Sequence, residues 1–402
     1  MQQAAARPEG LFRSALILGL MSMVGPFAID MYLPMMPEIG VALGVDEAAM
    51  GATIIGYFIA FGLAQLIYGP WADQSGRRLP IYFGLGVFAI GSVGAAMAGS
   101  LGTLVAWRFV QGLGGAAVMV VPRAIIRDMH TGAAATKMMA LIMLVISVSP
   151  MLAPLAGSGV AAVAGWRAIF WVLAVAAVAC VTLMHFALPE TLPPERRVKV
   201  NVAALTRVAG MLLRDAKFMG LTFVGGFGMA SFFIFIALAP FVYTQDFGLT
   251  PTQFSLAFAV NAAGFFGASQ AAGPLADRLG LTRVVLGGAT GFGLATATLF
   301  AVVATGGSSL VVVMVGLFIG NAFLGLVIPT TMVMALDDHG ENAGMASSLG
   351  GTLQMVAGGV AVGIATPFHN GTATPMIAAI AACGLASATL AWVVLSRVRQ
   401  AA

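Results

Sequence analysis

The sequence predicts an all-α membrane protein with twelve transmembrane helices in two six-helix halves. The first observation is its composition: 60% of the 402 residues are hydrophobic and 8% are charged, whereas soluble domains carry about 25% charged residues. A soluble fold of this size needs a charged surface that these residues do not supply. The second observation is that the apolar runs reach the length of about 20 residues that crosses a bilayer.

The third observation is an internal repeat. The chain reads GPWADQSGRRLPI at 69–81 and GPLADRLGLTRVV at 273–285, so the two copies begin 204 residues apart. Both copies follow the second helix of a predicted set of six, and such self-similarity indicates a duplicated architecture. We therefore expect an N-terminal six-helix bundle at 1–188, a cytoplasmic linker at 189–216 and a C-terminal six-helix bundle at 217–402.

Apolar runs between charged or turn-forming breaks give the individual spans. The twelve predicted spans are 14–37, 51–71, 79–98, 101–124, 138–162, 166–188, 217–242, 252–275, 282–304, 308–335, 343–365 and 374–395. The first is longer than the apolar part of a signal peptide and lacks a clear cleavage site, so we expect it to be retained. In the linker, four apolar residues recur at helical spacing and predict a helix on the cytoplasmic membrane surface. They are Val202, Leu205, Val208 and Leu212.

The Lys and Arg residues predict the orientation. With a cytoplasmic N-terminus, 17 of the 19 basic residues face the cytoplasm, while Arg167 lies outside and Arg108 lies within a span. The 17 are Arg7, Arg13, Arg77, Arg78, Arg123, Arg127, Lys137, Arg196, Arg197, Lys199, Arg207, Arg214, Lys217, Arg278, Arg283, Arg397 and Arg399. Because they are spread over many loops and form no single patch, they argue against nucleic-acid binding. We expect a multi-pass protein of the bacterial inner membrane with both termini cytoplasmic.

The sequence offers no catalytic or metal site. Cys180 and Cys383 lie within apolar spans, and the four histidines show no ligand spacing. No nucleotide-binding loop, nucleophile elbow or zinc motif is present. We therefore expect no enzyme activity, no metal and no cofactor. A membrane sensor or an intramembrane enzyme is the alternative class; the two-half motif set argues against the first and the missing catalytic cluster against the second.

Six motifs carry a resemblance that covers essentially the whole chain. They are IDMYLP (29–34), LAQLIYGPWAD (63–73), RFVQGLGGA (108–116), RAIIRDM (123–129), SPMLAPLAG (149–157) and LPETLPPERR (188–197). With them the chain resembles the major facilitator superfamily, and most of all its Bcr/CflA group of drug:proton antiporters. The resemblance implies alternating access to a site between the halves. It also implies export driven by the proton gradient alone, by a monomer whose partners are protons, small amphipathic substrates and the lipid bilayer.

Asp30 is the only acidic residue well inside the predicted spans. It lies 16 residues after Ser14, or roughly 24 Å along a helix at 1.5 Å per residue, which places it beyond the midplane toward the outside. An ionised carboxylate there costs several kcal/mol unless it is paired or hydrated. Because burial and a nearby cation act in opposite directions on its proton affinity, it suits a proton carrier. Alternatively, it bonds to backbone freed by Pro34 and Pro37 near the outer interface.

Arg108 is the only basic residue deep in a span, and a buried guanidinium needs an acceptor. We expect Asp30 as its partner, with Gln111, one helical turn on, as an intermediary. The resemblance places this R-x-x-Q pattern in the proton-coupling network. A purely structural pair that joins the first and fourth helices is the alternative.

The first copy of the repeat predicts a cytoplasmic gate. Its residues are Gly69, Asp73, Gly76, Arg77 and Arg78, with Asp128 after the fourth helix. Asp73 suits the positive end of another helix, which the resemblance identifies as the one starting near Asn342. The resemblance also pairs Arg77 with Asp128, and the whole set latches the outward-facing state. We expect a weaker second-half copy at Gly273, Asp277 and Asp337. The alternative is a solvated loop without energetic weight.

The fifth helix carries Pro150, Pro154 and Gly157 where the resemblance has its antiporter motif; a simple packing kink is the alternative. The small residues of GMASSLGG (344–351) predict close packing in the eleventh helix. An apolar cavity with few polar groups suits amphipathic drugs better than sugars. Its candidate residues are Tyr32, Tyr57, Gln65, Phe232, Phe235, Asn261, Asn321 and Gln354. A proton-coupled importer or exporter of one specific metabolite is the alternative function.

Overall fold

The computed structural model describes residues 8–130 and 132–401, which form helices and no strand. The helices are α1 (Pro8–Asp30), η1 (Leu33–Met35), α2 (Met36–Leu43), α3 (Glu47–Ser75), α4 (Arg78–Ala96), α5 (Leu101–Met129), α6 (Gly132–Ala164), α7 (Arg167–Ala187), η2 (Pro194–Arg196), α8 (Val202–Arg214), α9 (Ala216–Gln245), α10 (Pro251–Leu279), α11 (Leu281–Ala304), α12 (Leu310–Leu336), η3 (Asp337–Asn342), α13 (Ala343–Ala365), η4 (Thr366–Phe368) and α14 (Ala373–Ala401).

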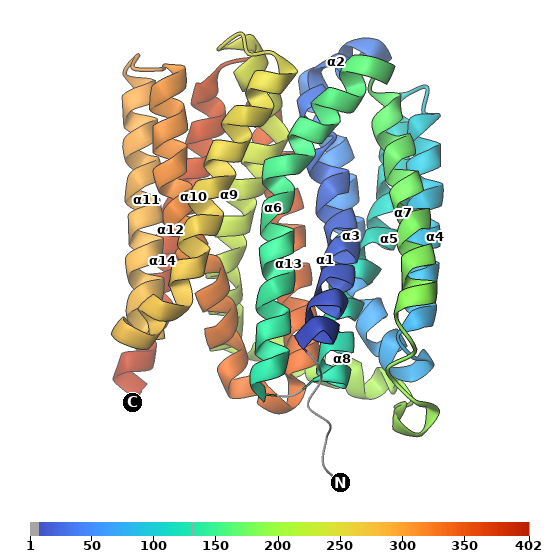
Figure 1. Ribbon diagram of the computed structural model, residues 1–402. Helices are drawn as coiled ribbons and strands as arrows, with labels where there is room; N and C mark the ends of the chain where they lie inside the picture. The colour runs from blue at the N-terminus through green and yellow to red at the C-terminus, as the bar shows by residue number, and fades with distance from the viewer. Residues whose placement is uncertain (1–7, 131, 402) are drawn as a thin grey trace.

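Twelve long helices stand side by side, one for each predicted span (Figure 1). Among the described residues, eleven segments are both long and apolar enough to cross a membrane. The remaining long helix is α10, whose 29 residues include several polar ones. These are Gln253, Ser255, Asn261, Ser269 and Gln270. The helix α10 packs beside α12, α11 and α6, and of its polar residues Ser255 and Asn261 are buried while Gln253 and Gln270 are exposed.

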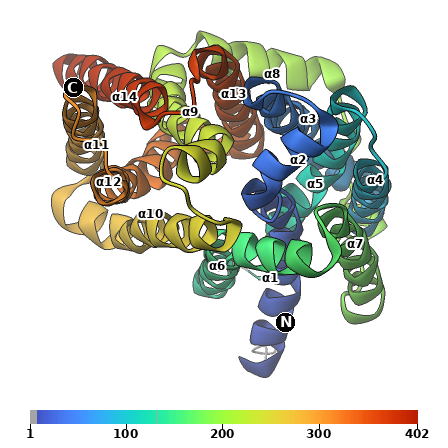
Figure 2. The same cartoon turned by 90° about the horizontal axis from the view of Figure 1, so that it is seen from above.

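Seen from above, α9 to α14 form one group and α1 to α7 the other, with α8 running along one side (Figure 2). The two groups meet mainly where α3 packs on α13 and α6 packs on α10. The helix α7 ends at Ala187 and α9 begins at Ala216. The division of the chain into domains at these points stays a prediction.

The repeat is visible in the geometry of the chain. The helices α3 and α10 are both 29 residues long and begin 204 residues apart, at Glu47 and Pro251. Each is followed by a glycine in the left-handed region, Gly76 at φ 92° and Gly280 at φ 85°. Glycine adopts this conformation without steric cost, so both copies of the motif make the same turn.

The first span differs from its prediction. It was expected to run unbroken over 14–37, but α1 ends at Asp30, and the chain turns before η1 and α2 continue it. The break occurs here because Pro34 and Pro37 each sit at the start of a new helix, where a missing N–H is tolerated. The apolar segment as a whole covers Ser14–Leu43, 30 residues in which Asp30 is the 17th. The predicted depth of Asp30, beyond the midplane toward the outside, stays a prediction.

The helix predicted within the linker is α8, whose first turn is capped by Asn201 through a 3.0 Å bond from the Ala204 N–H to Oδ1. Its Leu212 is fully buried against neighbouring helices, while Val202 at its start is exposed. Of the basic residues used to predict orientation, Arg7 lies outside the described residues. The side chains of Arg13, Lys137, Arg397 and Arg399 also lie outside the described part of the chain.

Candidate functional site

Arg108 lies at the centre of a buried polar cluster between α5, α1 and α3. Its side chain is inaccessible to solvent, and Nη1 donates to Ala28 O at 2.8 Å and to Gln111 Oε1 at 2.5 Å. The guanidinium carbon lies 4.9 Å from the ring centroid of Tyr32 and 4.5 Å from that of Tyr57. Aromatic faces attract cations, so two rings and two neutral oxygens share this charge.

The groups around Arg108 are themselves held in place. Gln111 Nε2 donates to Ser92 Oγ of α4 at 2.7 Å, which fixes the amide so that its oxygen faces the guanidinium. Tyr57 Oη donates to Gly25 O at 3.0 Å. Tyr32 Oη lies 2.8 Å from Thr53 Oγ1. The predicted contact between Arg108 and Gln111 is confirmed, and Tyr32 and Tyr57 serve this cluster.

Of the predicted link from Arg108 through Gln111 to Asp30, this conformation forms the contact with Gln111 but not the one with Asp30. Asp30 is 4% exposed, but among the described residues no hydrogen bond or ion pair joins its carboxyl group to Arg108. The cause is the turn that ends α1. The N–H of Tyr32 bonds to Ile29 O, so the Ala28 carbonyl has no partner within the helix and accepts from Arg108 instead. Within the described chain, Nε and Nη2 of Arg108 are buried without an acceptor.

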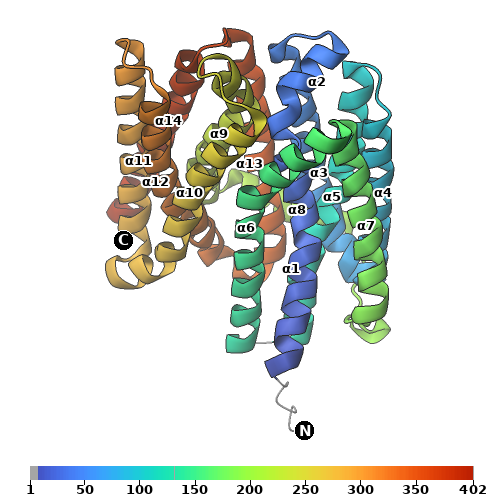
Figure 3. The same ribbon diagram turned by 45° about the horizontal axis from the view of Figure 1, so that its top comes forward.

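The proline-rich part of α6 packs directly against this turn. Pro150 and Pro154 lie inside α6, which changes direction in its upper part (Figure 1), as expected where prolines remove backbone bonds. Gly157 approaches Met31 so closely that a Cβ would collide with the Met31 carbonyl. Lower down, α1 and α6 run side by side (Figure 3). The prolines and the contact at Gly157 agree with the packing-kink alternative, and the antiporter role of this segment stays a prediction. The contacted residue, Met31, directly follows Asp30.

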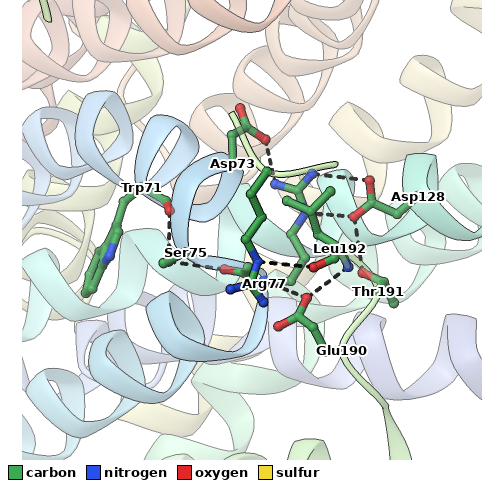
Figure 4. A network of polar contacts seen from close by, with 10 residues as sticks. Trp71, Asp73, Ser75, Arg77, Asp128, Glu190, Thr191 and Leu192 are labelled. Atoms are coloured by element: carbon green, nitrogen blue, oxygen red, sulfur yellow. Dashed lines mark hydrogen bonds and ion pairs between the residues drawn. The ribbon is translucent and has the colours of Figure 1, made fainter. Parts of the chain in front are cut away.

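A second polar cluster lies at the α3–α4 connection (Figure 4). Arg77 Nη1 donates to Asp73 Oδ1 at 2.6 Å, and its Nε and Nη2 donate to the two oxygens of Asp128 at 2.7 and 3.2 Å. The predicted Arg77–Asp128 pair is confirmed, with the bidentate geometry that makes such pairs specific. Burial alone lowers the pKa of Arg77, but its bonds to Asp128 and Asp73 outweigh burial, so the pKa lies above its ordinary value.

Glu190, which the sequence did not single out, ties this cluster to the linker. Its two oxygens accept the backbone N–H groups of Arg77 at 2.8 Å, Leu192 at 2.9 Å and Arg78 at 3.1 Å. Burial opposes ionisation of Glu190, but these N–H groups outweigh it and hold the pKa of the carboxyl below its ordinary value. Glu190 belongs to the motif LPETLPPERR, which contributed to the family resemblance but to which the sequence analysis assigned no function.

Two more linker bonds complete this cluster. Thr191 Oγ1 donates to Asp128 at 3.1 Å, and the Val198 N–H donates to the Asp73 carbonyl at 3.0 Å. Gly76 leaves room for the carboxylate, since a Cβ there would lie 2.7 Å from Glu190 Oε2. The linker therefore holds the α3–α4 turn from outside the repeat.

Asp73 does not make its predicted contact with the start of α13. Its carboxylate is bound to Arg77, and within the described chain no bond joins it to α13. Asp73 and the first residues of α13, beginning at Ala343, instead line the same cavity of about 600 Å³. We call it the α3–α13 cavity; its other walls come from α5, α8, the linker, the end of α12 at Leu336 and Met139 of α6. The gate is open at this face.

The predicted second-half copy of the gate is not formed. Gly273, Asp277 and Asp337 are exposed, and among the described residues neither carboxylate makes a hydrogen bond or ion pair. The polar contacts come from neighbours, with Lys217 Nζ 2.7 Å from Asp338 and His339 Nε2 3.1 Å from Asp215. The short helix η3, with non-helical His339, brings the two residues after Asp337 to the start of α9.

Of the eight predicted cavity residues, Gln65 lines the α3–α13 cavity and the other seven do not. Phe235 stacks on Phe258 at 5.6 Å and Phe232 on Phe265 at 6.1 Å. The three amide residues outside the cavity are buried: Asn261, which donates to Ala257 O at 3.1 Å; Gln354, whose amide lies 3.4 Å from Thr222 O; and Asn321. The contacts of Phe232, Phe235, Asn261 and Gln354 are all made among α9, α10 and α13.

That closure extends to the opposite face of the molecule. Phe58 of α3 stacks on Phe233 of α9 at 3.6 Å, and Thr352 of α13 donates to the Gly62 carbonyl of α3 at 2.6 Å. Near the far end, Glu47 bonds to His369 at 2.9 Å and to Gln245. The sequence did not indicate this outer pair. The structure is thus open at the α3–α4 face and sealed at the other.

Comparisons with known proteins agree with this architecture. The family model described as Major Facilitator Superfamily matches residues 18–362. An MFS-type transporter of Bacillus subtilis, YdgK, is 33% identical over 92% of this chain and 92% of its own. The bicyclomycin resistance protein homolog of Haemophilus influenzae is 28% identical over 97% of this chain and 98% of its own.

A shorter match is to multidrug resistance protein D of Escherichia coli, which is 30% identical over 63% of this chain and 64% of its own. Among solved structures, a partially occluded inward-open form of the E. coli xylose transporter XylE superposes with a TM-score of 0.74. It covers 96% of this chain and 97% of its own at 13% identity, so it shows the shared fold alone.

Proposed function

The chain belongs to the Major Facilitator Superfamily, and from that premise we propose that it is a proton-coupled antiporter exporting small amphipathic drugs or toxic compounds. It is a multi-pass membrane transporter rather than an enzyme, as members of this family are. The drug-resistance relatives support export of toxic compounds, because their names attach that activity to similar chains. The protein works as a monomer, driven by the proton gradient without a cofactor.

The orientation follows from charge. The α3–α4 connection and the linker lie at one face of the helix bundle (Figure 1), and together they carry seven of the 19 basic residues. Basic loops stay in the cytoplasm. The α3–α13 cavity therefore opens to the cytoplasm of a bacterium, and the Glu47–His369 pair closes the outer face.

The observation that carries the proposal is the imbalance between Asp30 and Arg108. Arg108 has two buried donors without acceptors among the described residues, and Asp30 lies two residues from the carbonyl that Arg108 uses. An unbound buried carboxyl group is stable when it is protonated, since an isolated ionised carboxylate in a membrane is costly. The inside-open conformation thus corresponds to Asp30 carrying its proton.

The transport cycle follows from this state. When Asp30 releases its proton to the cytoplasm, its carboxylate becomes an acceptor for the free donors of Arg108. Pairing the two draws α1 toward α5 next to the turn where Gly157 of α6 packs. Substrate binding from the cytoplasm favours this proton release, and reprotonation from outside breaks the pair after the halves have rocked. The differential contact between Asp30 and Arg108 in the two states supplies the coupling.

The test measures proton release by the purified protein in detergent, in weakly buffered solution near neutral pH. Bicyclomycin and chloramphenicol are added to the wild type, to Asp30→Asn and to Glu38→Gln, a matched carboxyl-to-amide control at an exposed residue of α2. We expect release from the wild type and from Glu38→Gln, and none from Asp30→Asn. Drug binding without proton release by the wild type, or release that survives Asp30→Asn, would overturn the proposal.

A further inference from the structure

The α3–α13 cavity has an uneven charge. Its walls are largely apolar, with Leu66, Val120, Val121, Leu205 and Met345 among them. The charged residues that line it are Asp73, Arg123, Arg127 and Lys199. The one carboxylate is bound to Arg77 at 2.6 Å, a cation that it shares with Asp128. With three cations against one carboxylate, the residues that line this cavity carry a net positive charge.

The three cations have no protein counter-ion in the described part of the chain. No hydrogen bond or ion pair is made there by Arg123, Arg127 or Lys199. Arg123 and Arg127 lie four residues apart on α5, where like charges repel each other. Arg123 is the deeper of the two and is only partly exposed. An anion in the cavity would relieve this repulsion.

The start of α13 adds to the same potential. Ala343, Gly344 and Met345 form the first turn of this 23-residue helix and line the cavity, and no side chain of Asn342 caps it. A helix N-terminus carries a partial positive charge of about half an elementary unit and presents N–H donors. The apolar wall continues from this turn toward Gln65, deeper in α3.

We infer that the α3–α13 cavity binds amphipathic anions, molecules with a carboxylate or sulfonate on an apolar body, and disfavours amphipathic cations. The anionic group lies between Arg123 and the start of α13, and the apolar body lies along Leu66 and Val120. This inference rests on the proposed export function and names the class of substrate that it accepts from the cytoplasm. The physical reason is that charges of one sign in a cleft with apolar walls focus the electric field and attract ligands of the opposite charge.

The test compares two dyes that share a xanthene core, anionic fluorescein and cationic rhodamine 123. Binding to the full-length protein in a nonionic detergent is measured by fluorescence anisotropy for the wild type, Arg123→Gln and Arg214→Gln. Arg214 is an exposed arginine of α8 that does not line the cavity, so it controls for net charge. Arg123→Lys, which keeps the charge, controls for folding together with gel filtration.

We expect the wild type to bind fluorescein at least about tenfold more tightly than rhodamine 123, on the scale of a charge-assisted hydrogen bond. Arg123→Gln loses about tenfold for fluorescein and nothing for rhodamine 123, while Arg214→Gln stays within about twofold. Arg123→Lys keeps most of the affinity. Raising the salt from about 50 to about 500 mM weakens fluorescein binding, since salt screens an accessible site.

Three results would overturn the inference: equal binding of both dyes, binding of neither, or unchanged fluorescein binding in Arg123→Gln. The antiport proposal fails separately. Suppose that chloramphenicol releases protons only when Asp30 is present, but Arg123→Gln binds both dyes as the wild type does. The antiport proposal then stands, and the proposed anion site is wrong. Suppose instead that fluorescein binding depends on Arg123 but no compound causes Asp30-dependent proton release. The proposed anion site then stands, and the antiport proposal is wrong.

Discussion

The α3–α4 and α10–α11 connections share a motif but not a structure around it. Both follow a 29-residue helix, and both turn at a glycine with positive φ. In the first, Arg77 binds two carboxylates and a linker segment closes over it. In the second, Asp277 is exposed and makes no polar contact within the described chain. The motif thus encodes the turn, while the ionic cluster depends on residues elsewhere.

Two missing partners explain the difference. At the positions 204 residues after Arg77 and Arg78, the second copy has Leu281 and Thr282, so it lacks the central cation. The carboxylate that closes the first cluster is Glu190, which belongs to the linker rather than to the repeat. The N-terminal side of the cytoplasmic face is therefore held together by ions, and the C-terminal side is looser. Four predictions test this contrast, from the largest effect to the smallest.

Replacing the central cation should make the first connection resemble the second. Arg77→Leu leaves Asp128, whose side chain is 9% exposed, without its bidentate partner. Removing one partner of a buried ion pair lowers the free energy of unfolding by about 3–5 kcal/mol. Because Asp73 is half-exposed and solvent screens its charge, we expect a loss of about 3 kcal/mol. Thermal unfolding in detergent measures it. Arg78→Leu is the control, because Arg78 bonds to neutral Tyr82 and to the His185 carbonyl; equal losses for both variants would contradict the prediction.

The two glycines that share a turn should differ on substitution. Gly76→Ala meets both an unfavourable φ and the Glu190 carboxylate, whereas around Gly280 nothing lies within 4 Å of a new Cβ. We expect a loss of about 2–3 kcal/mol for Gly76→Ala and about 1 kcal/mol for Gly280→Ala. Both are read as shifts in melting temperature under the same conditions. If Gly280→Ala is the more damaging, the role assigned to Glu190 is wrong.

Glu190 should give the first connection a pH dependence that the second lacks. Because the folded-state pKa of Glu190 lies below its ordinary value, its stabilisation is present above the unfolded pKa of about 4.3 and is lost as pH falls through the folded pKa. Glu190→Gln should therefore cost about 1 kcal/mol at neutral pH, a value already reduced for solvent screening.

The measurement is the melting temperature from pH 7 down to about pH 4. The gap between wild type and Glu190→Gln should be constant at the upper end and should narrow at the lower end. Glu195→Gln is the control, as this carboxylate is exposed and lies in the same segment. A gap that widens on acidification would show the opposite sign of the linkage.

The smallest effects are expected around α12. Asp338→Asn removes an exposed ion pair with Lys217 and should lower the melting temperature slightly at low salt and not at high salt. Asp337→Asn should have no effect, since Asp337 makes no polar contact within the described chain. If Asp337→Asn lowers the melting temperature more than Asp338→Asn does, Asp337 contributes to a second-half gate as the sequence predicted.

The sequence by itself determined the features that depend on neighbours along the chain. Apolar runs specified twelve long helices, and glycines at equal places in the repeat specified two equal turns. The sequence identified Asp30 and Arg108 as candidate functional residues because charged residues are rare within membrane spans. The break inside the first span was not predicted, and only the structure showed that α1 ends at Asp30 and that the chain continues as η1 and α2.

Tertiary structure decided every partnership between distant residues. Arg108 reaches back 80 residues to the Ala28 carbonyl, which is open only because the turn after Asp30 diverts the next N–H. Glu190 reaches 113 residues to Arg77, and Gln65 alone of the predicted cavity residues faces the cavity. Such contacts depend on how helices pack and on which face of the transporter is open. The pattern of neighbouring residues specifies a helix and its apolar faces. Which buried acceptor a side chain such as Arg108 binds depends on how the helices pack against one another.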